Sequence, residues 1–426
     1  MEMRTVGGSY FPSFFCIKIE TSDVPEKFLS NKNVSTIAHE YIHFLQNAST
    51  VFCMANTSNV FKDIFYFYNI KDDKIVLPYR FSSDLEIREI NNNLFEIYFN
   101  RCDYHTVPTL ISINIIETSA KDYFIEGFPE LKAFEIEISS NGHSEKYGFG
   151  AFAIMEGMAN MIENHMYPKA QVNGLNIPYD LPGIVANYIY APIFNNKAFL
   201  VALCDMSLMY YHPAEVFIKI LRIMADSQFV PQTIYDIYNF VHNHLQIPGA
   251  TFKTFWHNTY NNTCSDIMNL VNVETYNNAR NWALDSLKLF YDIRNRDITF
   301  ISQLMLLSPA DAQHSLFSFI QKEAAPPICN NNMQFGLIGG NAMPEEKKEI
   351  LFTGIICQKF LNIYFIIISH IVLLDFFVRL VKNVNILKCH GEGRDVDIVL
   401  FSSIHECWDY IKEKLILPNG TSHNIR

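Results

Sequence analysis

The segment Ser35-Thr-Ile-Ala-His-Glu-Tyr-Ile-His-Phe-Leu-Gln46 decides how the rest of the sequence is interpreted. It contains two histidines four residues apart, and a glutamate directly follows the first histidine. Apolar residues recur in and just after this segment at the spacing of an α-helix, namely at Ile37, Tyr41, Phe44 and Ala48. We therefore predict one helix from Ser35 to about Ala55, and we expect it to be buried because its other sides are also apolar.

The His-Glu-x-x-His pattern has the spacing of a metal site on a helix. Residues four apart lie one turn apart on the same face, so His39 and His43 can direct imidazole nitrogens at one ion about 2.0 Å away. Glu40 is offset by one position and can instead take a proton from the attacking water as a general base. A chance histidine pair on a surface helix is the alternative. The apolar surroundings disfavour it, because buried charges need a partner such as zinc.

Two histidines do not complete a catalytic zinc site, which typically has three protein ligands and one open position. No histidine or aspartate follows in the next turn, at residues 46–48. We expect the third ligand to be Glu156, within the apolar helical segment FGAFAIMEGMANMIE at 149–163. Glu156, Asn160 and Glu163 share one face of that helix, and Glu163 is the reserve ligand. A solvated polar edge is the alternative interpretation of this face.

Taken together, the His-Glu-Tyr-Ile-His helix and the later Glu-Gly-x-Ala helix resemble the gluzincin class of zinc peptidases, which includes thermolysin-like enzymes and zinc aminopeptidases. The resemblance covers residues 35–46 and 150–163. It implies one zinc ion held by His39, His43 and Glu156, with Glu40 as the catalytic base. In thermolysin-like members an aspartate four residues after the glutamate ligand orients a zinc histidine. Here that position is Asn160, whose amide oxygen accepts the imidazole proton more weakly.

The same resemblance implies a way to bind an extended peptide. Asn141-Gly142 marks a hairpin just before the Glu156 helix, and its edge strand can pair with substrate backbone. Gluzincins also use a tyrosine or histidine to stabilise the oxyanion. The sequence does not choose among the candidates, which are Tyr147, His165, Tyr211 and His212.

Hydrophobic periodicity predicts an α+β fold. We expect a strand in FFCIKIE (14–20) and a mainly antiparallel sheet from 74 to 147, built from KIVLPYRF, LFEIYF, TLISINII and AFEIEIS. Helical spacing dominates from about 148 to 308, with a connection at 167–192. The predicted domains are a gluzincin-like catalytic half at 1–170, a large helical domain at 171–325 and a mixed α/β segment at 326–426.

The amino-acid composition of the chain limits the classes of molecule that we expect it to bind. The formal net charge is −11 and the basic residues are scattered, so neither nucleic acid nor an anionic membrane is an expected partner. The most apolar stretch, 360–374, is shorter than the roughly 20 residues of a spanning helix, and we expect it to form a buried helix. The odd number of scattered cysteines favours a reducing compartment, and residues 1–15 do not resemble a secretory signal. We expect a cytoplasmic protein.

These observations predict a zinc-dependent hydrolase, a metallopeptidase that cleaves a narrow set of intracellular proteins. A regulatory protein is a further candidate partner. The alternative is a catalytically inactive, metallopeptidase-like module that binds other proteins.

Overall fold

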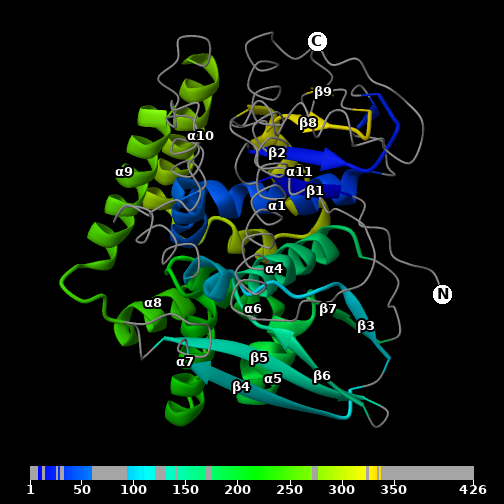
Figure 1. The fold of residues 1–426 in the computed structure, drawn as a ribbon, viewed down its shortest axis with the longest axis vertical. Helices are drawn as coiled ribbons and strands as arrows, with labels where there is room; N and C mark the ends of the chain where they lie inside the picture. Colours follow the sequence, from blue (N-terminus) through cyan, green and yellow to red (C-terminus); the bar gives the residue numbers. More distant parts are fainter. Residues whose placement is uncertain are drawn as a thin grey trace, which may run out of the picture. The chain divides into compact units, whose positions relative to one another are not determined.

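The structure is a computed structural model that describes a defined part of the chain (Figure 1). The described residues are 8–11, 15–24, 27–28, 33–59, 94–108, 110–119, 131–140, 143–168, 174–270, 277–322, 326–332 and 335–336. Contacts divide the chain into two units, one of residues 1–63 and 88–356 and one of residues 64–87 and 357–426, and every described residue belongs to the first. The predicted strand at 74–81 and the predicted buried helix at 360–374 lie outside the described residues.

The helix that carries the histidine pair is α1 (Val34–Ser49), and it is buried from Ile37 to its end, as predicted. The prediction of one unbroken helix to about Ala55 is wrong at Thr50. This residue is extended (φ −108, ψ 151), and residues 51–59 form a second helix. The hydroxyl groups of Ser49 and Thr50 donate hydrogen bonds to the carbonyl oxygens of Leu45 and Gln46, which satisfies acceptors at the end of α1.

The second helix of the site is α4 (Ala151–Met166), which packs directly against α1. Residues 94–99 precede its sheet in the chain and form a helix, so the strand predicted for LFEIYF is wrong. Within this short segment only Glu96 is exposed, so its apolar pattern suits a buried helical turn as well as a strand. Asn100 then adopts a left-handed conformation (φ 41) and packs against Gly148 and Gly150, where any side chain would collide with it or with Phe99.

Besides the helices, the described residues form three sets of strands (Figure 1). An antiparallel sheet contains β4 (Ser112–Ser119), β5 (Lys132–Ser140) and β6 (His143–Gly148), and its register pairs Ser140 with His143, which confirms the predicted hairpin. An amino-terminal sheet has the order β1 (Gly8–Phe11), β2 (Cys16–Ile19), β8 (Ile328–Cys329) and β9 (Phe335–Gly336), and it confirms the strand predicted in FFCIKIE. A two-stranded ribbon joins β3 (His105–Val107) to β7 (Leu175–Ile177).

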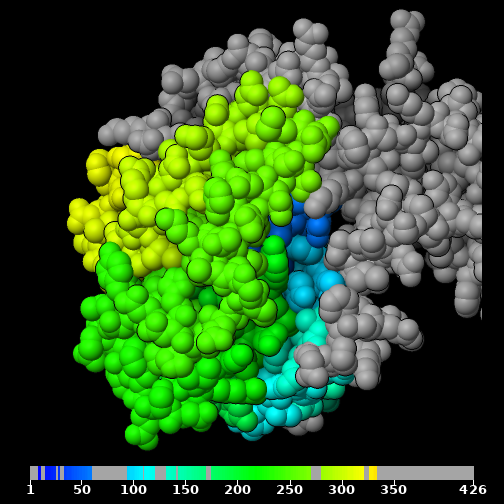
Figure 2. Space-filling view, turned by 90° about the vertical axis from the view of Figure 1, so that its left-hand side faces the viewer, coloured from blue at the N-terminus to red at the C-terminus, as the bar shows by residue number. Residues whose placement is uncertain are grey.

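The predicted helical body is confirmed, although the predicted connection at 167–192 is shorter because β7 and the next helix lie within it. The helices are α5 (Leu181–Phe194), α6 (Lys197–Leu208), α7 (Pro213–Ser227), α8 (Ile234–His244), α9 (Phe252–Leu270), α10 (Asn277–Arg296), the 3-10 helix η5 (Ser302–Leu306) and α11 (Pro309–Lys322). Figure 2 shows these helices, green to yellow, as one continuous surface beside the cyan strands. No helix in the described ranges is long and apolar enough to cross a membrane.

One hydrophobic core contains side chains from Phe15 to Ile328, so residues from 1–170 and from 171–325 share it. The division at residues 170 and 325 stays a prediction. A buried ion pair crosses this core: Nη1 and Nη2 of Arg294 on α10 donate to the carboxylate of Asp205 on α6, at 3.0 and 2.9 Å. Arg294 also donates to the hydroxyl of Ser49 at the end of α1. The described fold is therefore a mixture of helices and antiparallel sheet, in agreement with the α+β class.

Candidate metal centre

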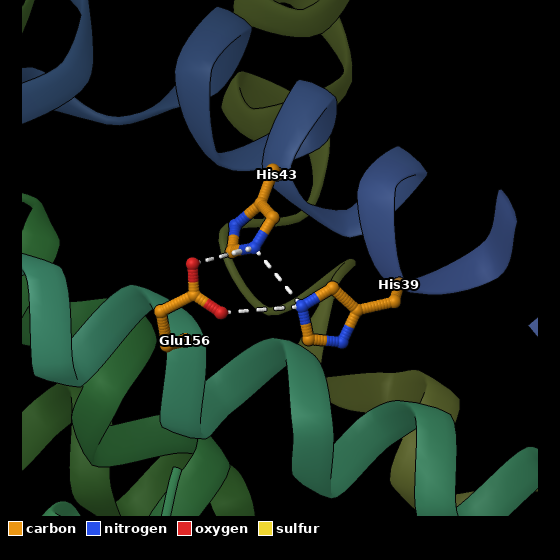
Figure 3. A group of neighbouring side chains, drawn as sticks. All are labelled: His39, His43 and Glu156. Carbon is orange, nitrogen blue, oxygen red and sulfur yellow. Dashed lines mark hydrogen bonds and ion pairs between the residues drawn. The ribbon is translucent and has the colours of Figure 1, made fainter. Parts of the chain in front are cut away.

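Three of the side chains predicted to bind a metal meet between α1 and α4 (Figure 3). The Nε2 atoms of His39 and His43 lie 3.2 Å apart. One carboxylate oxygen of Glu156 lies 3.3 Å from Nε2 of His39, and the other lies 3.5 Å from Nε2 of His43. All three residues are buried or nearly so, and they form a group that can hold a metal ion.

The orientation of His43 is fixed by the neighbouring turn of α1 and by the backbone of α4. Nε2 of Gln46 donates to the carbonyl oxygen of Met155, so Oε1 of Gln46 must face the other way. That oxygen lies 2.8 Å from Nδ1 of His43 and can only accept a hydrogen bond. Neutral His43 therefore carries its proton on Nδ1, and its Nε2 presents a lone pair to the centre. Sequence reasoning passed over Gln46 as a residue that merely occupied the position of a possible ligand.

His39 is held in the same way by Glu163. A carboxylate oxygen of Glu163 lies 3.2 Å from Nδ1 of His39, on the side of the ring opposite Glu156. The expectation that Asn160 orients a zinc histidine is wrong, because its amide oxygen accepts a hydrogen bond from Asn164 instead. Glu163, seven residues after Glu156, lies on the same helical face and reaches His39 because it is two turns further along α4. Its position is that of an orienting partner and not that of the third ligand.

The spacing of the three residues is suited to a metal ion. A tetrahedral centre with ligand distances of 2.0–2.1 Å places neighbouring ligand atoms about 3.3–3.4 Å apart. The two imidazole nitrogens lie 3.2 Å apart and Oε2 of Glu156 lies 3.3 Å from Nε2 of His39, both close to this value. With one ligand atom taken from each residue, all three atoms lie within 4.8 Å of one another. In neutral imidazoles that carry their protons on Nδ1, the two Nε2 atoms have lone pairs and cannot hydrogen-bond to each other at 3.2 Å, so this arrangement favours a cation between them. A set of two imidazoles and one carboxylate is suited to a divalent transition metal.

Without a metal, a proton is the cation that this arrangement favours. Burial opposes a charge on His39, but hydrogen bonds to Glu156 and Glu163 outweigh it and raise the pKa of His39 to about 10. Burial acts against ionisation of Glu156 too, yet the adjacent His43 and His39 hold the pKa of Glu156 well below its usual range. The electrostatic field of the site is therefore suited to positive charge at the centre of the three residues.

Glu40 lies beside this group without belonging to it. Its side chain is 5% exposed, and no described residue hydrogen-bonds to its carboxylate. Burial raises the pKa of Glu40 above its ordinary value, although His39 and His43 oppose the shift. Gly8 of β1 lies against Glu40, since a Cβ atom on Gly8 would be 3.2 Å from its Cγ. A buried carboxylate with a raised pKa is suited to accept a proton near neutral pH.

Two tyrosines that the sequence analysis missed also reach the site. The hydroxyl of Tyr104 donates to a carboxylate oxygen of Glu156 at 3.2 Å, and the ring of Tyr179 lies 5.9 Å from that of His39. Tyr104 precedes β3 and Tyr179 follows β7, so the pairing of these strands brings the two tyrosine rings within 5.7 Å of each other. Burial raises the pKa of both hydroxyls, which remain protonated donors at neutral pH. No local sequence pattern marks them, because only the ribbon unites residues so far apart.

Four residues were predicted as candidates for stabilising an oxyanion. In the described structure, each of them forms a hydrogen bond away from the metal centre. The Tyr147 hydroxyl donates to Glu145. Tyr211 pairs with Thr259, and His165 bonds to the carbonyl oxygen of Leu307. Nε2 of His212 donates to the carbonyl oxygen of Lys132. None of these four candidates hydrogen-bonds to His39, His43 or Glu156 in the described part of the chain.

Comparison of the chain with protein-family models, curated proteins and solved structures gives no match. The similarity to gluzincins therefore rests on the motif residues and on the geometry of the site alone.

Proposed function

We propose that the protein is a zinc-dependent peptidase of gluzincin type that hydrolyses peptide bonds in a narrow set of intracellular proteins. One observation carries the proposal: two histidines, each with Nδ1 bonded to an orienting oxygen, turn their Nε2 atoms towards the same carboxylate of Glu156. The neighbouring Glu40 supplies a buried carboxylate of the kind that a hydrolytic site needs.

Each residue has a distinct role in the proposed reaction. When bound, zinc would polarise the scissile carbonyl group and acidify the attacking water. Glu40 accepts the proton of that water and then transfers it to the leaving amine. Tyr179 donates a hydrogen bond to the oxyanion that develops on the carbonyl oxygen, and Tyr104 donates its hydrogen to the ligand Glu156. Glu163 and Gln46 keep the two imidazoles in the orientation that the metal requires.

The thiols support the proposed location inside the cell. The described cysteines are all unpaired, and five of the six are buried: Cys16, Cys53, Cys102, Cys204, Cys264 and Cys329. Unpaired thiols are typical of proteins in a reducing compartment. The restricted range of substrates follows from this location, because an unselective peptidase would damage the cell that makes it.

The alternative is a protein-binding module in which the metal has only a structural role. Structural zinc sites are usually closed by a fourth protein ligand. Among the described residues, the group that can hold a metal contains three ligands: His39, His43 and Glu156. A position left for water or substrate favours catalysis over a purely structural role.

The first test is elemental analysis of the purified full chain, alongside hydrolysis of a peptide library followed by mass spectrometry. We expect one zinc ion per chain in the wild type, its loss in His39→Ala and Glu156→Ala, and its retention in Glu40→Gln. Glu40→Gln should abolish hydrolysis, because the amide cannot accept the proton of the water. Absence of zinc after reconstitution would reject the proposal. Zinc with full hydrolysis in Glu40→Gln would reject the role of Glu40.

A further inference from the structure

The chain between Asn100 and Tyr104 runs along the same face of α4 that carries Glu156. At one end, Asn100 packs against Gly150 at the start of α4 and donates to the carbonyl oxygen of Phe134 at 2.6 Å. At the other end, Tyr104 donates to Glu156. The guanidinium carbon of Arg101 lies 5.6 Å from the centre of the Phe152 ring. Phe152 precedes Glu156 by one helical turn, so Arg101 is held about one turn from the metal ligand.

Arg101 is held in place, and no described residue is its anionic partner. Its side chain is exposed, and in the described structure it makes no hydrogen bond or ion pair. Arg222 contrasts with it, since it pairs with Glu117 at 2.7 Å. The buried Arg294 pairs with Asp205. Stacking on an aromatic ring restrains the guanidinium while leaving its N–H groups directed at the surroundings.

We propose that Arg101 binds a carboxylate of the substrate beside the metal centre, an inference that rests on the proposed peptidase function. A guanidinium presents its donors in a planar fork that matches a carboxylate in two places at once. A peptide offers that group either at its carboxyl terminus or on an aspartate or glutamate side chain. The preferred substrates of this site are therefore peptides with a carboxylate a short distance from the scissile bond.

Binding of hydroxamate peptides to the zinc-loaded full chain tests this inference by calorimetry, without any need for turnover. The probes are malonyl hydroxamates of Ala-Glu and Ala-Gln, each prepared with a free and with an amidated carboxyl terminus. Charge-assisted hydrogen bonds predict about tenfold tighter binding of a probe that bears the recognised carboxylate. Tighter binding of both free acids identifies the terminal carboxylate as the ligand, whereas tighter binding of both Ala-Glu probes identifies the side chain.

Matched variants connect this preference to Arg101. In Arg101→Gln we expect the tenfold preference to disappear while zinc content is unchanged, and in Arg101→Lys we expect it to be partly retained. Arg296→Gln, which removes an exposed arginine from α10, is the control for lost charge and should retain the full preference. Equal affinity for all probes in the wild type would overturn the role of Arg101 alone, as would an undiminished preference in Arg101→Gln. A chain that binds no zinc would overturn the proposed function and this inference together.

Discussion

Glu156 and Glu163 lie on one face of α4. Zinc binding by variants that lack one of the two carboxylates distinguishes a metal ligand from a residue that orients a ligand. The oxygens of Glu156 face Nε2 of both histidines, whereas an oxygen of Glu163 faces Nδ1 of His39. Glu156→Gln should therefore abolish tight zinc binding. Glu163→Gln should weaken it while leaving one zinc ion per chain.

The expected loss of zinc affinity depends on whether the residue that replaces Glu163 still offers His39 a hydrogen-bond acceptor. Partners that orient a ligating histidine contribute about 10-fold to 100-fold in metal affinity. Glu163→Gln keeps an oxygen that can accept the proton of Nδ1 but loses the charge, so we expect about tenfold weaker binding, or about 1.4 kcal/mol. Glu163→Ala leaves a buried N–H group of His39 without an acceptor, so we expect about 100-fold, or about 2.8 kcal/mol.

Zinc affinity is measured by competition with a chromogenic chelator, and stoichiometry by elemental analysis. Cobalt substitution adds a check on the ligand set, because its visible absorption spectrum should keep the shape seen in the wild type when only Glu163 is changed. Glu215→Gln, an exposed change on α7, controls for the loss of one negative charge. Unchanged affinity in Glu163→Ala would refute the orienting role. Loss of zinc in Glu163→Gln with retention in Glu156→Gln would show that the two roles are reversed.

Further expectations concern the packing, the core and the protonation of the site. A Cβ atom on Gly157 would lie 2.6 Å from Cγ of Pro182, so Gly157→Ala should lower the free energy of unfolding by about 1–3 kcal/mol in urea denaturation. Arg294→Met leaves Asp205 as an uncompensated buried charge and should destabilise the protein by about 3–5 kcal/mol, whereas adding Asp205→Leu should recover much of that loss. The raised pKa of His39 stabilises the metal-free fold fully below its unfolded value of about 6.5, and this contribution declines as pH rises through 10. Urea denaturation of chelator-treated protein should therefore show falling stability across this pH range, with the effect removed in His39→Ala.

The residues whose signal is local were predictable from the sequence. The apolar pattern around His39 and His43 predicts a helix. Because the two histidines are four residues apart, they lie on the same face of α1 once that helix forms. Glu156 was predictable because a carboxylate within an otherwise apolar helix requires a partner. The hairpin between β5 and β6 was predictable because Asn-Gly is suited to a tight turn.

The residues whose role depends on tertiary contacts were not predictable. Gln46 and Glu163 orient the histidines only because α1 and α4 pack directly against each other. Tyr104 and Tyr179 reach the site through the pairing of two three-residue strands, which are too short to show an alternating pattern. The break at Thr50 was missed because the apolar pattern continues through it into the second helix.

The ligands come from positions 117 residues apart in the chain, since His39 and Glu156 are donated by separate helices. During synthesis, α1 leaves the ribosome before α4 exists, so a nascent chain that ends before α4 cannot assemble the metal centre. The centre can form only after the two helices have met in the core. Any activity that depends on a metal at this site would begin only after α1 and α4 have packed together.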